Sequence, residues 1–129
     1  MTAPAALLSL TLAAAAAAQT PPEAAVAPDG AVLRGLDRVS GALEDIEIAP
    51  GQTVAYGRLE ITLSECRYPA ETPLGDAYAH LTIREAGADT PAFDGWMIAS
   101  SPALMALDHP RYDVWVLRCR ISSAETSGG

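Results

Sequence analysis

The segment FDGWMIASSPALMALDHPRYDVWVLRCRI, residues 93–121, is the most informative part of the chain. It contains both tryptophans, the only phenylalanine, one of the two cysteines and one of the two histidines. Its first part, residues 92–99, is predicted to form a strand that is interrupted at Gly95. Ser101 followed by Pro102 is typical of a helix N-cap and first helical position, so a helix of one or two turns is expected over residues 103–107.

The last part of this segment, residues 112–121, is the most apolar predicted strand. Its apolar side chains fall on both faces, with Val114 and Val116 on one and Trp115 and Leu117 on the other. Because both faces are apolar, the strand is expected to be central in its sheet and covered on two sides. Trp115 is accordingly expected in the core.

Short strands are expected along the rest of the domain. Residues 58–64 and residues 77–84 alternate between polar and apolar side chains, which predicts two half-buried strands. Cys66 falls out of phase with the apolar face of the first one, so a bulge or strand end is expected around Glu65. Shorter strands separated by turns are expected over residues 31–39, 42–48 and 53–56. With one short helix, these elements predict an all-β fold, a small β-sandwich or partly open barrel of about seven strands.

The chain begins with an apolar, Ala-rich run that ends at Ala18 and is followed by QTPP. This pattern is typical of a signal peptide over residues 1–18, cleaved after Ala18, and it predicts a periplasmic protein. The run is too short to span a bilayer comfortably, so no stable membrane anchor is expected after cleavage. No Lys or Arg precedes it, so either the true start lies upstream of Met1 or the N-terminal amine alone supplies the positive charge. The alternative is a disordered Ala-rich arm on a cytoplasmic protein.

The mature part has room for one domain. Residues 19–30 are rich in Ala, Pro and Gly without a period, and are expected to be a flexible leader. Residues 31–121 are expected to form a single β-domain. Residues 122–129 lack a hydrophobic pattern and are expected to be a disordered tail.

The charge balance excludes one class of partner. Eight basic residues, all of them arginine, stand against 16 acidic residues, which gives a net charge of −8. A nucleic acid is bound through local positive charge that releases counterions, and the sequence has no basic cluster. No nucleic-acid partner is therefore expected.

The two cysteines, Cys66 and Cys119, are expected to form a disulfide, because an even number of cysteines in an exported chain usually pairs. Closing a loop of about 50 residues contributes roughly 3–4 kcal/mol to stability in the chain-entropy model. The alternative, a redox-active pair, lacks the C-x-x-C spacing that such pairs use.

No catalytic residues are assigned. His109 lies near Asp108, Ser100 and Ser101, which allows a Ser-His-Asp triad to be drawn, yet no nucleophile-elbow glycine pattern surrounds either serine. The two histidines, the two cysteines and the scattered carboxylates show no metal-ligand spacing, so neither a metal nor a cofactor is expected. Nothing specific supports a paired-carboxylate glycosidase.

Trp96, His109 and Tyr112 are the candidate binding residues. Aromatic side chains are suited to a platform for a sugar or a peptide, but a domain with one phenylalanine also needs its large aromatic side chains for burial. His109 has an alternative role at the C-terminus of the expected helix, where a partly positive imidazole is favoured.

Several of these residues carry a resemblance to a known family. The chain resembles DUF2155, a set of small exported proteins of alphaproteobacteria, over nearly the whole mature domain. The matching segments are LRGLD at 33–37, GRL at 57–59, GWMIASSPAL at 95–104, HP at 109–110 and YDVW at 112–115, with Cys66 and Cys119. The resemblance implies export and a shared Cys66–Cys119 bridge. It implies no catalytic residues, because the family has no assigned function.

We therefore expect a non-enzymatic binding or accessory module of the cell envelope, with another envelope protein as its partner. The reasons are the lack of a convincing catalytic constellation and the aromatic surface between Trp96 and Tyr112. One alternative is a small hydrolase that acts on cell-wall or carbohydrate material with His109 as its base. A third class is small-ligand binding in a barrel mouth.

Overall fold

Eight β-strands make up the domain in the computed structural model, which describes residues 2–7 and 23–121. Their bounds are β1 Ala24–Val26, β2 Ala31–Asp37, β3 Leu43–Ile48, β4 Thr53–Tyr56, β5 Leu59–Pro69, β6 Tyr78–Glu85, β7 Phe93–Ile98 and β8 Tyr112–Cys119.

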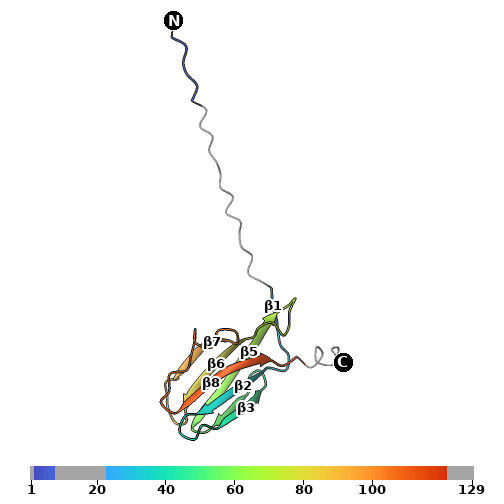
Figure 1. The fold of residues 1–129 in the computed structure, drawn as a ribbon, viewed down its shortest axis with the longest axis vertical. Coiled ribbons are helices and arrows are strands. Elements are labelled where there is room, and N and C mark those ends of the chain that lie inside the picture. Colours follow the sequence, from blue (N-terminus) through green and yellow to red (C-terminus); the bar gives the residue numbers. More distant parts are fainter. Residues whose placement is uncertain (1, 8–22, 122–129) are drawn as a thin grey trace.

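The strands form two antiparallel sheets that pack against each other (Figure 1). In the five-stranded sheet, β1 and β4 pair with different parts of one edge of β5, while β6 and then β7 follow on its other side. The three-stranded sheet has the order β3-β2-β8. Neither sheet closes into a barrel within the described residues. The all-β prediction is confirmed, with eight strands where about seven were expected.

Alternating side chains of β5 and β6 contribute to the core between the sheets. The most deeply buried of them are Leu59, Ile61, Leu63, Ala79, Leu81 and Ile83. A register shift between Leu63 and Glu65 makes Ser64 an extra residue in β5, so Cys66 returns to the buried face. The predicted bulge is confirmed.

A disulfide joins Cys66 of β5 to Cys119 of β8, with the two Cα atoms 5.7 Å apart. The expected pairing is thus present. Because β5 and β8 belong to different sheets, the bond ties the two layers together.

Strand β8 differs from the sequence prediction in two ways. It forms an edge of the three-stranded sheet beside β2, so the expected central position is wrong. A second register shift leaves Leu117 as an extra residue, and Val116 and Cys119 therefore both face the core. Trp115 lies half-buried on the opposite face, so its expected place in the core is also wrong.

The predicted short helix is wrong as well. The segment after Ser101 contains a single turn, closed by a hydrogen bond from the Leu104 N–H to the Ser101 carbonyl, and no helix is present among the described residues. Pro102 suits the second position of such a turn. A helix would also turn the apolar side chains to one side, whereas Leu107 is buried and Leu104 is exposed. The segment instead connects the end of β7 with the start of β8.

The ends of the chain lie largely outside the described residues. These residues contain neither the predicted cleavage site after Ala18 nor the tail at 122–129, and only residues 2–7 of the predicted signal peptide are included. Within the expected leader, residues 24–26 form β1, which pairs with Arg67–Pro69 at the end of β5. Among the described residues, no helix has the length and hydrophobicity needed to cross a membrane.

Candidate functional site

The three candidate binding residues do not form one cluster. Trp96 is opposite His80 in the pairing of β7 with β6. His109 contacts Glu85, five residues further along β6, which corresponds to about 16 Å along the strand. Tyr112 lies beside His109, with ring centroids 5.3 Å apart. The structure thus brings His109 and Tyr112 together and places Trp96 elsewhere.

Buried His109 organises the connection that leads into β8. Its Nδ1 accepts hydrogen bonds from the backbone N–H groups of Arg111 and Tyr112, each at 3.1 Å. Since Nδ1 is an acceptor in both, the neutral ring carries its proton on Nε2, which donates to Glu85 at 3.1 Å. The His109 carbonyl accepts a 2.7 Å hydrogen bond from Arg38. Both ring nitrogens are therefore engaged in holding the chain.

Ser100, one of the two serines of the hypothetical triad, lies in a different hydrogen-bond network. The Ser100 hydroxyl donates to Asp76 at 2.7 Å, and the Ser100 backbone N–H donates to the same carboxylate at 3.0 Å. His109 has no serine among its hydrogen-bond partners in the described chain. The described residues also contain no group of three or more His, Cys, Asp or Glu side chains placed to hold a metal ion.

Tyr112 belongs to an aromatic corner with Tyr56, and both side chains are buried. Their rings meet edge to face with centroids 5.5 Å apart. Burial raises the pKa of Tyr56, and the nearby carboxylates of Glu44 and Asp37 act in the same direction. A small pocket of about 240 Å³ opens beside the two rings.

The Asp37–Arg111 ion pair borders this pocket. The guanidinium of Arg111 lies over the Tyr112 ring at 5.2 Å and donates to Asp37 through two nitrogens. This hydrogen bonding holds the pKa of the Asp37 carboxyl below its ordinary value. This pair was not predicted from the sequence, because its partners lie 74 residues apart.

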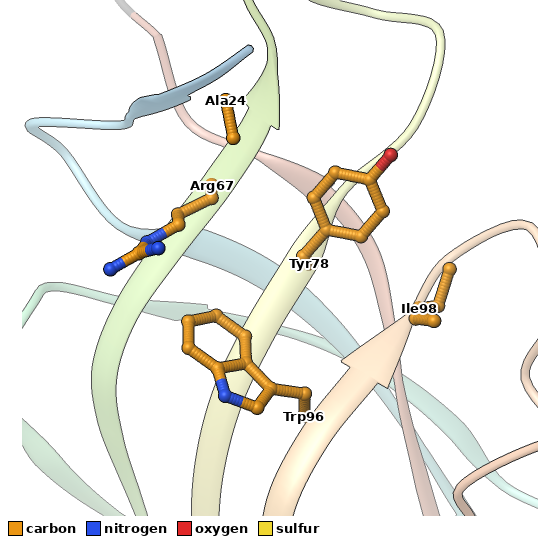
Figure 2. Close-up of a pocket in the computed structure, with 5 residues that line it drawn as sticks. All are labelled: Ala24, Arg67, Tyr78, Trp96 and Ile98. Carbon is orange, nitrogen blue, oxygen red and sulfur yellow. The ribbon is translucent and has the colours of Figure 1, made fainter. Parts of the chain in front are cut away.

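Trp96 lines a separate pocket on the outer face of the five-stranded sheet. The pocket has a volume of about 360 Å³ and is lined by Ala24, Arg67, Tyr78, Trp96 and Ile98. Figure 2 shows these side chains rising from the neighbouring strands β5, β6 and β7, with Ala24 of β1 across from them. The lining is mainly apolar and aromatic, which is typical of small-ligand sites.

The Trp96 ring is held from two directions. The His80 ring meets it edge-on at a centroid distance of 5.1 Å, and the Arg67 guanidinium lies 5.3 Å from its centroid. His80 is itself fixed by a 3.0 Å hydrogen bond to Ser64. His80, Arg67 and Tyr78 were not among the binding residues predicted from the sequence. Tyr78 and His80 lie on the polar face of the strand predicted over residues 77–84, whereas Arg67 lies beyond the end of the strand predicted over residues 58–64.

A second apolar surface lies along the connection between β7 and β8. It is formed by residues 102–106 together with Trp115, and it includes a hollow of about 360 Å³ lined by Pro102, Ala103, Ala106, Asp113 and Trp115. Leu104 and Met105 are 69% and 44% exposed. We call this the connection surface.

Comparisons with known proteins identify the family. A family described as an uncharacterised protein conserved in bacteria (DUF2155) matches residues 31–119. An uncharacterised protein of Rickettsia prowazekii (strain Madrid E) is 30% identical over 87 residues, which cover 65% of this chain and 56% of the relative. The chain thus spans little more than half of that relative's length. No solved structure matches. The resemblance seen in the sequence is confirmed, and the chain belongs to the DUF2155 family.

Proposed function

We propose that this protein is a non-enzymatic accessory module of the cell envelope that acts in the periplasm after export. Two observations support export: the Ala-rich N-terminal run and the disulfide between the sheets. Disulfides persist in oxidising compartments such as the periplasm and are rare in the cytosol.

The connection surface supports a binding role best. Leu104 and Met105 are exposed in the same short segment as Pro102, Ala103 and Ala106, which line a hollow together with the half-buried Trp115. Exposed apolar patches of this kind mark interaction sites in soluble domains. Trp and Met are also enriched in protein interfaces, where a large side chain anchors the partner.

The partner that fits the connection surface is another envelope protein. Asp108 and Asp113 flank the apolar residues, and the whole chain carries a net charge of −8. A surface of this charge repels anionic lipid headgroups and nucleic acids. A protein partner with an apolar centre and basic residues at its rim complements it.

The alternative of a hydrolase with His109 as base gains no support from the geometry. Nδ1 of His109 already accepts two backbone N–H groups, and Nε2 faces Glu85 instead of a hydroxyl nucleophile. A general base needs a free nitrogen lone pair within hydrogen-bond reach of the proton that it removes.

The test uses the full chain in its native cells with a photoreactive amino acid in place of Leu104. The same amino acid at Val39, which is 77% exposed on the turn between β2 and β3, is the matched control. We expect irradiation to yield an adduct with an envelope protein from position 104 only. The protein identified in this way is then purified and titrated against the wild-type chain and variants.

Leu104→Asp is expected to weaken that binding by about tenfold or more, because it puts a charge into the apolar centre of the interface. Val39→Asp adds the same charge elsewhere and is expected to leave the affinity unchanged. Equal effects of the two substitutions, or an adduct between two copies of this chain alone, would overturn the proposal.

A further inference from the structure

We propose that the pocket around Trp96 is a glycan-binding site that takes an N-acetylated pyranose ring. It lies on the outer face of the five-stranded sheet and shares no lining residue with the connection surface. The site therefore adds a second binding activity to the module.

Trp96 provides a fixed aromatic surface. A pyranose has a face of C–H groups that packs against an aromatic ring and an edge of hydroxyl groups that forms hydrogen bonds. Trp96 is suited to the apolar face because His80 and Arg67 both pack against its ring. A ring that is already in place loses little conformational entropy when a ligand stacks on it.

The groups around the Trp96 ring complement an acetamido substituent. The aromatic ring of Tyr78 and the aliphatic side chains of Ala24 and Ile98 surround the hollow (Figure 2). These apolar groups suit the methyl of an acetamido substituent. Figure 2 shows the Tyr78 hydroxyl pointing away from Trp96 and Arg67, so Tyr78 contributes its aromatic ring to the hollow.

Arg67 supplies hydrogen-bond donors at the same place. Its Nη2 donates to Glu65 at 2.7 Å, and among the described residues neither Nε nor Nη1 has a hydrogen-bond partner. A neutralised, stacked arginine with unused N–H groups can donate to uncharged oxygens such as hydroxyl and acetamido oxygens. The Glu65 carboxylate at the same time disfavours a strongly anionic ligand.

The surroundings of the hollow favour a sugar over a protein or a lipid. Next to Trp96 the outer face carries Ser64, His80, Thr82 and Asp94, so the apolar area ends after a few side chains. Protein interfaces bury about 800 Å² per partner around a broader apolar centre. A volume of about 360 Å³ lies at the lower end of the range for small-molecule sites.

The test is a titration of the full, oxidised, ¹⁵N-labelled chain with chitotetraose, observed through the indole N–H signals. The protein has two tryptophans, so the spectrum contains two such signals, and Trp96→Phe assigns them. We expect the Trp96 signal to shift in a saturable way, with a dissociation constant of about 1 mM or less, while the Trp115 signal stays in place. Cellotetraose, which has the same linkage without acetamido groups, is expected to bind at least about threefold more weakly.

Two variants distinguish the loss of the Trp96 ring from a general loss of folding. Trp96→Ala is expected to weaken chitotetraose binding by about tenfold or more, whereas Trp115→Ala is expected to leave it unchanged. Backbone amide signals next to the pocket report binding in these variants and show whether each is folded. His80→Ala tests whether His80 holds the Trp96 ring in position. It is expected to weaken chitotetraose binding less than Trp96→Ala does.

The proposal is overturned if chitotetraose shifts neither the Trp96 indole nor the amides around it. It is also overturned if Trp96→Ala binds as the wild type does. Equal binding of cellotetraose overturns the acetamido assignment. Because the connection surface is tested with a protein partner and at Leu104, these results leave the accessory role to be judged by its own experiment.

Discussion

The imidazole Nε2 of His109 lies 3.1 Å from a carboxylate oxygen of Glu85, which fastens the connection before β8 to the end of β6. The other ring nitrogen accepts two backbone N–H groups of the same connection. One side chain thereby fixes the path of the chain from one sheet into the other. We interpret His109 as a structural residue.

His109→Ala is therefore expected to destabilise the protein by about 2–4 kcal/mol, because it leaves buried backbone donors without acceptors and opens a cavity. The measurement is urea unfolding followed by circular dichroism. His80→Ala is the matched control, since His80 is partly exposed and is expected to cost less than about 1 kcal/mol. Wild-type stability of His109→Ala would show that the ring does not support the fold.

Sequence alternation located most strands because burial on one face imposes a period of two. It also predicted the bulge near Glu65, since Cys66 was visibly out of phase. The bulge at Leu117 left no such sign, because β8 is apolar on both faces and either parity looked acceptable. Because the sequence did not show which face of β8 is buried, Trp115 was wrongly expected in the core.

The binding surfaces were harder to predict than the strands. Trp96 was identified by its residue type, but its neighbours Arg67 and His80 come from other strands that only the sheet pairing brings together. His109 and Tyr112 were also identified by residue type, and the structure buries both: His109 accepts backbone hydrogen bonds, and Tyr112 packs against Tyr56 beside a small pocket. Residue type alone does not distinguish a buried aromatic side chain from an exposed one.

The Cys66–Cys119 bond is expected to be a major source of stability. It closes a loop with a sequence separation of 53, which in the chain-entropy model corresponds to about 4 kcal/mol. The double variant Cys66→Ala/Cys119→Ala should lose roughly that amount in urea unfolding at neutral pH. A reducing agent should destabilise the wild type and leave the double variant unaffected, and an equal effect on both would contradict a role for the bond.

Gly35 is expected to be required where β2 passes the Tyr56 ring. A Cβ added at this position would lie 2.7 Å from Tyr56 Cε1, inside van der Waals contact. Because Tyr56 is buried and packs against Tyr112, its ring has little room to move, and Gly35→Ala should cost about 1–3 kcal/mol.

Gly95→Ala is the matched control for Gly35→Ala. Its new methyl would meet the flexible end of Met105 at 3.3 Å, which can shift into solvent because Met105 is 44% exposed. Thermal unfolding of both variants compares the two sites. A loss at Gly95 as large as the loss at Gly35 would contradict the packing argument.

The Asp37–Arg111 pair is expected to make the stability of the domain decrease at acidic pH. Hydrogen bonding to Arg111 lowers the pKa of Asp37 below its ordinary value of 3.8, so the ionised carboxylate is favoured in the folded state. Its stabilisation is present at pH values above the unfolded pKa and is lost as the pH falls through the lower folded pKa. Asp37→Asn keeps an oxygen that can accept the Val39 N–H but removes the charge.

This variant should therefore be modestly less stable than the wild type at pH 7, and the difference should disappear as the pH falls well below 3.8. Urea midpoints between pH 2 and pH 7 measure the effect. Glu71→Gln is the control, because Glu71 is exposed and forms no ion pair within the described residues. If the difference between Asp37→Asn and the wild type stayed constant across this range, the lost stability would come from the altered hydrogen bonding of the side chain, and its charge would contribute nothing.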